Sequence, residues 1–192
     1  MLRFIFLVLS SIMTIAAAAQ DDWSGAIELN SFDQQIFTLC PDGSFKAADG
    51  RDFVIVQVPD ADKKMIAGHF FLAYGRNSED ASLCYYNTEY KEAGDTISIS
   101  GTSVDLSKTF FVEAISYTVR FVCADGFIKI YAPSNLSVEK FSDFPKYITW
   151  KHYFRKDGSV NPKMQSRHDE INTRLNLVCV AAPLAALKSM GK

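Results

Sequence analysis

The feature that most constrains the fold is the β-rich run at residues 109–133, TFFVEAISYTVRFVCADGFIKIYAP. β-Branched and aromatic residues dominate this run, and these residue types are enriched in strands. Gly126 interrupts it with turn chemistry, so the run predicts two strands and part of a third. The chain is therefore expected to build its core on a sheet.

Shorter segments before this run also have strand character, because they are rich in β-branched or alternating residues and are bounded by turn residues. They lie at residues 26–29, 35–39, 53–58 and 96–100. In the last of them Ile97 and Ile99 share one face, which predicts a half-buried strand.

Residues 62–90, DKKMIAGHFFLAYGRNSEDASLCYYNTEY, predict two adjacent antiparallel strands. The apolar and aromatic run from His69 to Tyr74 has the composition of a strand. Turn residues follow from Gly75, and the second strand is expected at residues 83–90, where bulky and polar residues alternate.

The pattern changes at Ser134, after which apolar residues recur at spacings of three and four. This spacing predicts one amphipathic helix that begins near Asp143, ends near Gly158 and packs on the sheet. Residues 161–180 fit either a further helix or, in their last part, a closing strand.

The first 19 residues have the pattern of a secretory signal peptide. Arg3 is followed by an apolar segment that is too short to span a membrane, and small alanines precede a cleavage point before Gln20. Residues 20–192 are then expected to form a single secreted, extracellular domain with no membrane anchor.

Charge gives no indication of a nucleic acid or an anionic membrane as the partner. The formal net charge is −2 at pH 7, and the charges of both signs are scattered along the chain. Proteins that bind these polyanions usually concentrate Lys and Arg on one surface. We therefore expect neither partner.

Cys40, Cys84, Cys123 and Cys179 all lie in the expected mature chain. An even number of cysteines in a secreted chain predicts two disulfides, and the sequence permits three pairings. Their wide spacing does not fit the paired ligands of a zinc site.

No catalytic motif is present, so we expect no enzymatic activity and no cofactor. The sequence has no GxSxG motif, phosphate-binding loop or dinucleotide-binding glycine pattern. His69, His152 and His168 are far apart and have no metal-ligand spacing, so they are interpreted as surface or packed side chains.

Several short segments occur in the order found in lipocalins, and the chain resembles that family, including its triabin-like and apolipoprotein-D-like members. The segments are Cys40-Pro41, Asp60 to Lys64, Gly68-His69-Phe70-Phe71, Cys84, Ile115-Ser116-Tyr117 with Cys123, and residues 130–137. Phe70 stands where the family has its signature Trp, and Tyr131 stands where it has an Arg.

The resemblance implies a mainly β fold: an antiparallel β-barrel with a lipocalin-like calyx, either complete or shortened, and one C-terminal helix packed on it. It also implies disulfides between Cys40 and Cys123 and between Cys84 and Cys179. The aromatic and apolar side chains expected to line a ligand cavity are Phe70, Leu72, Tyr74, Tyr86, Tyr90, Phe111 and Tyr117. Simple core packing is the alternative role for these residues.

Two functions follow as hypotheses. The first is a lipocalin-like protein that sequesters or carries a small hydrophobic ligand. The second is a secreted, disulfide-bonded β-domain with a filled core that acts by contact with another extracellular protein. Asn135-Leu136-Ser137 is in addition a sequon for N-glycosylation in a secreted chain.

Overall fold

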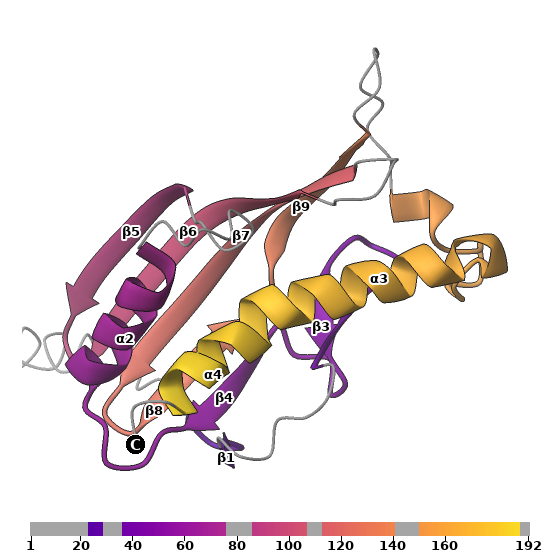
Figure 1. Ribbon diagram of the computed structural model, residues 1–192. Coiled ribbons are helices and arrows are strands. Elements are labelled where there is room, and N and C mark those ends of the chain that lie inside the picture. Colours follow the sequence, from indigo (N-terminus) through magenta and orange to yellow (C-terminus); the bar gives the residue numbers. More distant parts are fainter. Residues whose placement is uncertain (1–22, 29–35, 76–85, 107–112, 141–149, 189–192) are drawn as a thin grey trace, which may run out of the picture.

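A computed structural model of the chain describes residues 23–28, 36–75, 86–106, 113–140 and 150–188 (Figure 1). These residues form a β-rich fold with helices on one side of a sheet. The strands are β1 (Ile27–Glu28), β2 (Phe37–Leu39), β3 (Phe45–Ala47), β4 (Phe53–Gln57), β5 (Tyr86–Ala93), β6 (Thr96–Leu106), β7 (Glu113–Ala124), β8 (Phe127–Tyr131) and β9 (Ser134–Lys140). The longer helices are α2 (Lys63–Gly75), α3 (Gln165–Asn176) and α4 (Ala182–Lys188).

The main sheet has seven strands in the order β1-β4-β8-β7-β6-β5, and β9 pairs with β7 beyond the end of β8. β1 is parallel to β4, and the other pairs are antiparallel, so the sheet is mixed. β1 and β5 are its edges among the described residues. The expected β-rich fold is confirmed, but the expected closed barrel is not found, because the sheet is open.

Most of the predicted strands are present. β1, β2, β4 and β6 match the short predicted segments, and the run at residues 109–133 contains β7 and β8, with a turn at Gly126. Gly126 has a φ of +77°, a conformation that glycine adopts without steric cost. The second strand predicted within residues 62–90 corresponds to β5.

The first strand predicted within residues 62–90 is wrong, because this segment is helix α2. The Asp62 carboxylate accepts a hydrogen bond from the Met65 amide at 2.8 Å and so caps the helix N-terminus. Ile66 and Phe70, four residues apart, are both buried against the sheet. The composition of His69–Tyr74 suits a strand, but the cap and the burial spacing belong to a helix.

The C-terminal prediction also needs correction. Ser134–Lys140 is strand β9, residues 141–149 lie outside the described part, and Trp150–His152 form only a short 3-10 turn. Phe154 then bridges Val160 in an antiparallel pair. The long helical segment comes later: α3 continues through a π-helical turn, Leu177–Ala181, into α4, so the helical alternative for the tail is confirmed.

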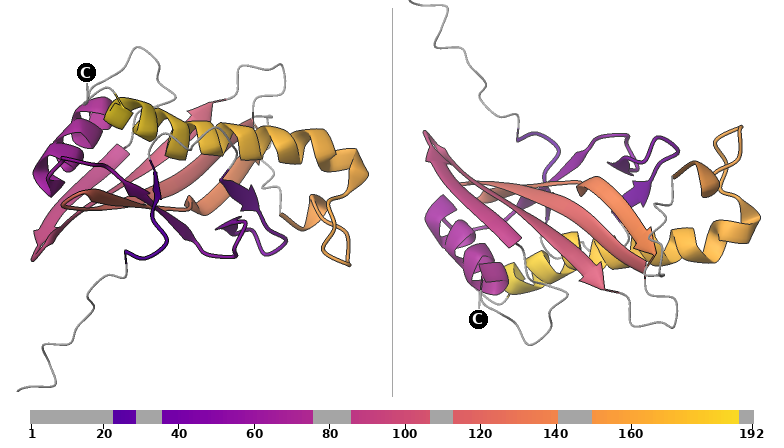
Figure 2. Two further views of the ribbon diagram at one scale, coloured as in Figure 1. Left: turned by 90° about the horizontal axis from the view of Figure 1, so that it is seen from below. Right: turned by 90° about the horizontal axis from the view of Figure 1, so that it is seen from above.

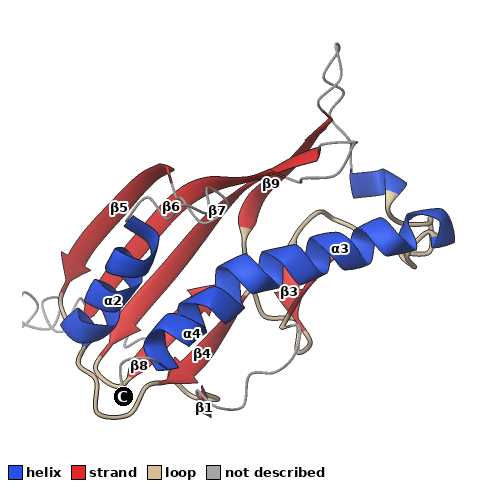
Figure 3. Ribbon diagram, in the orientation of Figure 1, coloured by secondary structure: helices blue, strands red, loops and turns tan. Residues whose placement is uncertain are grey.

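α2 and α4 pack against each other and cover the same face of the sheet, which we call the inner face (Figures 2 and 3). Buried apolar side chains from alternate positions of the strands fill it. Tyr117, Phe121 and Ile130 are each at most 1% exposed. The hydrophobic core therefore lies between this face and the helices.

The hairpin of β2 and β3 forms a separate two-stranded sheet that α3 holds in place. The Asn176 Oδ1 atom accepts hydrogen bonds from the backbone amides of Ile36 and Phe37 at 2.9 and 2.8 Å. Asn172 Oδ1 accepts one from the Leu39 amide at 2.8 Å. Helix side chains thus take the place of a neighbouring strand along β2.

Among the residues described, no helix is both long and apolar enough to cross a membrane.

Candidate functional site

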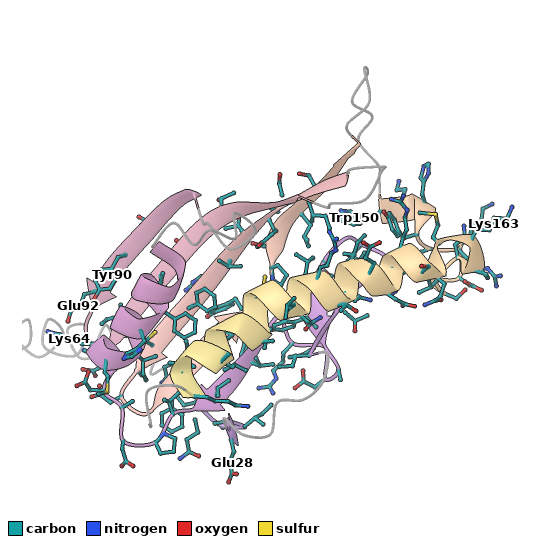
Figure 4. All side chains as sticks on the ribbon, in the orientation of Figure 1. Glu28, Lys64, Tyr90, Glu92, Trp150 and Lys163 are labelled. Carbon is teal, nitrogen blue, oxygen red and sulfur yellow. The ribbon has the colours of Figure 1, made fainter. Side chains whose placement is uncertain are left out.

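The structure does not gather the residues expected to line a ligand cavity. Phe70 and Tyr117 are buried in the core, and the Phe70 ring packs on Phe121 with centroids 4.8 Å apart. Tyr90 is 47% exposed at the β5 edge, near Glu92 and Lys64 (Figure 4). The remaining members are Leu72 and Tyr74 on α2, Tyr86 on β5, and Phe111, which lies outside the described residues.

The expected disulfide between Cys40 and Cys123 is not formed, because both residues have free thiols. Cys40 follows β2, whereas Cys123 lies in the core on β7. Burial raises the pKa of the Cys123 thiol to about 12. Cys84 lies outside the described residues, so its expected bond to Cys179 stays a prediction.

Asn135 is exposed on β9 with a φ of +53°. Its side-chain amide donates to the Thr118 hydroxyl at 3.4 Å. The sequon is thus accessible on the surface, and its glycosylation stays a prediction.

The surface with distinctive chemistry is the other face of the sheet, which we call the outer face. Strand residues that alternate with the core positions point to it. Across the middle of this face, Lys129 lies opposite Ile55 on one side and Val122 on the other. Among the described elements the three helices lie on the opposite side (Figure 2).

Aromatic rings and cations gather on this face over β4, β8 and β7. We call this group the outer-face cluster; its members are Trp23, Arg51, Phe53, Arg120, Phe127, Lys129 and Tyr131. The four aromatic side chains are half-buried and Arg120 is exposed.

Ring contacts tie the cluster together. The Trp23 and Phe127 ring centroids are 5.8 Å apart, and those of Phe53 and Tyr131 are 5.9 Å apart. Phe53 and Tyr131 are directly paired residues of β4 and β8, so the sheet register fixes their contact. Such tilted ring pairs are stabilising beyond their buried area.

Each cation of the cluster lies over an aromatic ring. The Arg120 Cζ atom is 4.5 Å from the Tyr131 ring centroid, and the Arg51 Cζ atom is 5.2 Å from that of Phe53. The Lys129 ammonium lies 5.0 Å from the Trp23 ring and 5.1 Å from the Phe53 ring, and Lys129 is only 5% exposed. Cation–π attraction offsets part of the cost of burying this charge.

Hydroxyl side chains continue the outer face from the cluster toward β5. Ser98, Ser100 and Thr102 of β6 alternate with the buried isoleucines, and Thr118 of β7 lies 3.5 Å from Thr102 between the two hydroxyl oxygens. Ser100 is paired with Arg120 across the β6–β7 ladder. This part of the face offers hydrogen-bond donors and acceptors but little apolar area.

A second polar cluster, on α3, has a structural role. His168, Asn172 and Asn176 are buried at four-residue spacing, and the His168 Nε2 atom is 3.3 Å from the Leu39 carbonyl oxygen. The Phe154 ring packs edge-on against His168, with centroids 5.5 Å apart. These groups bond to the β2 backbone, which indicates a structural role.

In the part of the chain that is described, no group of three His, Cys, Asp or Glu side chains could hold a metal ion. The exposed carboxylates with altered acidity belong to local turns. Hydrogen bonds from Ser44 hold the pKa of Asp42 below its usual value, and Ser159 does the same for Asp157. These hydrogen bonds stabilise the local turns in which the two carboxylates lie.

Sequence reasoning missed the outer-face cluster because its residues come from four separate segments. One signal was available: Phe127, Lys129 and Tyr131 alternate with the apolar Ile128 and Ile130. That alternation places the three residues on one face of a strand. It does not reveal that Trp23, Phe53 and Arg120 join them.

Comparisons with known proteins give a limited result. No known protein family and no curated protein matches the sequence. Among solved structures, the chain is similar to a DUF4468 family protein from Bacteroides ovatus, with 11% identity over 69% of this chain and 84% of that chain and a TM-score of 0.47. It is also similar to a TBP-like protein from Parabacteroides distasonis, with 15% identity over 71% of this chain and 90% of that chain and a TM-score of 0.46. Likenesses of this size do not assign the chain to a family.

Proposed function

We propose that this protein is a secreted, non-catalytic binding protein that acts by contact with another extracellular protein through the outer face of its sheet. The observation that carries the proposal is the outer-face cluster, a group of half-exposed aromatic rings and arginines on the side of the sheet opposite the core.

The composition of the cluster is that of a protein contact surface. Trp, Tyr and Arg are enriched among the residues that contribute most to binding between proteins. Here they stand on neighbouring strands, and ring contacts and cation–π contacts hold them before any partner binds. A pre-ordered surface loses little side-chain entropy on association.

The carrier hypothesis has less support. A carrier needs an interior space, whereas Phe70 and Tyr117, two of the residues expected to line it, are at most 1% exposed and belong to the packed core. Side chains from the sheet and from α2 and α4 occupy the region where a calyx was expected.

The proposal can be tested by panning a phage-displayed random peptide library against the purified mature protein. Peptides selected in this way are expected to bind through the outer-face cluster, so most should lose binding to Tyr131→Ala. Tyr90→Ala is the matched control, because Tyr90 is an exposed tyrosine at the β5 edge of the same sheet.

Two results would overturn the proposal. One is that the selected peptides bind Tyr131→Ala as tightly as the unmodified protein. The other is saturable one-to-one binding of a hydrophobic fluorescent probe that Tyr131→Ala leaves unchanged, because this would favour an internal ligand site. Circular dichroism of both variants establishes that they are folded.

A further inference from the structure

We infer that the outer-face cluster recognises an acidic segment of a protein partner, and that Arg120 binds a carboxylate of that segment. This inference rests on the proposed function and adds the chemistry of the partner.

Arg120 is placed for such a contact. It lies on β7, a central strand of the sheet, and is exposed. Its guanidinium group lies over the Tyr131 ring with the Cζ atom 4.5 Å from the centroid. A guanidinium carries five N–H donors, so contact with one ring leaves donors that can bind a carboxylate.

Arg120 is also distinct among the arginines of the cluster. The Arg51 Nε atom donates to Asp49 at 2.6 Å, so an internal carboxylate already neutralises that charge. Within the described parts of the chain, no ion pair involves Arg120. The charge of Arg120 is thus available to an incoming carboxylate.

The surrounding charges favour an anion at this position. Lys129 lies on β8, the strand next to β7, and Lys91 lies on the outer face of β5. Glu89 and Glu28 are acidic residues on the same side: Glu89 is paired with Ser100, which in turn is paired with Arg120, and Glu28 is paired with Gln57 at the β1 edge of the sheet. Glu89 is therefore two strands from Arg120, or about 10 Å between backbones.

The rings explain why the anion is better supplied by a peptide than by a sugar or a nucleic acid. Sugars and nucleic-acid bases bind by stacking on open aromatic faces. In this cluster Phe53, Tyr131 and Trp23 each have a cation over the ring. Arg120 is exposed, Ser100 is paired with it, and Thr118 lies on the same face of β7; their guanidinium and hydroxyl groups can bind carboxylates and peptide amides.

The experiment measures binding of a fluorescein-labelled glutamate-rich peptide by fluorescence anisotropy, with a glutamine-rich peptide of equal length as the uncharged control. We expect the glutamate peptide to bind more tightly, and its affinity to fall as salt is added.

Arg120→Gln should weaken binding by about tenfold or more, the equivalent of one charge-assisted pair. Arg120→Lys should restore part of the affinity, because lysine keeps the charge but not the planar fork. Lys91→Gln, at the β5 edge, should change it less than Arg120→Gln.

Equal affinity for the two peptides, no measurable binding of the glutamate peptide, or unchanged binding by Arg120→Gln would each overturn the inference. Binding of polygalacturonate, a carboxylated polysaccharide, in preference to the glutamate peptide would overturn it as well. If the panned peptides depend on Tyr131 but show no preference for acidic residues, the inference fails and the proposed function stands. If they do not depend on Tyr131, the proposed function fails.

Discussion

The inner and outer faces of the main sheet are made by alternate residues of the same strands, yet they differ in composition and in exposure. The middle of the outer face is buried, with Ile55 and Val122 0% and 3% exposed, but around it lie partly exposed rings and hydroxyl groups. On the inner face, Val119, Phe121 and Cys123 are at most 1% exposed and pack against the helices. On the outer face, Thr118 is half-buried and Arg120 is exposed. The comparison shows how a period of two lets one strand serve two purposes, stability on one side and contact on the other.

The energies of the two faces differ for the same reason. Burial of a whole aromatic side chain on the inner face removes its apolar area from water, whereas the outer rings are only partly covered. Substitutions on the inner face should therefore change the free energy of unfolding, and those on the outer face should mainly change binding. Four predictions test this division, beginning with the largest contrast.

The largest contrast is expected in thiol reactivity. Cys123 is fully buried on the inner face with its pKa raised to about 12, whereas Cys40 is half-buried after β2. The thiolate is the reactive form, so at pH 8 Cys123 should react at least about 1,000-fold more slowly than Cys40. Alkylation followed by peptide mass spectrometry measures both rates, and the rate at Cys123 should rise steeply in denaturant. Comparable rates in the native protein would contradict the burial of Cys123.

Replacement of a core ring should have the next largest effect. Phe70→Ala removes a side chain that is 1% exposed and packed on Phe121, so it should lower the free energy of unfolding by about 3–5 kcal/mol. The outer-face control is Phe53→Ala, which removes a half-buried ring and should cost about 1–2 kcal/mol. Urea denaturation measures both values, and equal losses would remove the distinction between the faces.

A third prediction extends the comparison to buried polar groups. Asn176→Ala removes the acceptor for the Ile36 and Phe37 amides and the donor to the Phe37 carbonyl, so it should cost about 2–4 kcal/mol. Leu177→Ala, at the neighbouring position that is 59% exposed, should change stability by less than about 0.5 kcal/mol. If Leu177→Ala lost stability and Asn176→Ala did not, the stabilising role assigned to the Asn176 hydrogen bonds would be wrong.

The smallest effect is expected for the cation–π pair on the outer face. Arg120 and Tyr131 should have a coupling energy of about 0.5–1 kcal/mol in a double-mutant cycle of the two alanine variants. The measurement is again the free energy of unfolding. A coupling energy near zero would mean that the contact contributes nothing before a partner binds.

Local pattern was sufficient for most of the sheet. Alternation and turn residues located β4, β6, β7 and β8 in the sequence, because each strand keeps one face in the core. The same local rules failed at α2. The run from His69 to Tyr74 is apolar at so many positions that it fits the two-residue period of a strand as well as the 3.6-residue period of a helix. The deciding group was Asp62, whose carboxylate caps the helix through the amide three residues later; this cap signal is local in the sequence, but the strand-like composition of residues 69–74 outweighed it.

Closure of the sheet and the identity of the site could not be read from local pattern. Whether a sheet closes depends on which strands meet at its edges, and here α2 and α4 cover the inner face while β1 and β5 stay apart as edges of the described part. The outer-face cluster depends on contacts between residues as distant in sequence as Trp23 and Lys129. Such contacts depend on the order of the strands in the sheet, and that order cannot be predicted from local sequence patterns.

The amide contacts between α3 and the β2–β3 hairpin have a consequence for how the chain folds during synthesis. The hairpin is among the first parts of the fold to leave the ribosome, but its backbone partners Asn172 and Asn176 follow 133 to 140 residues later. Contacts of such long sequence separation form slowly, because a large loop must close before they contribute. Residues 36–47 therefore cannot make these native backbone contacts until α3 has been synthesised.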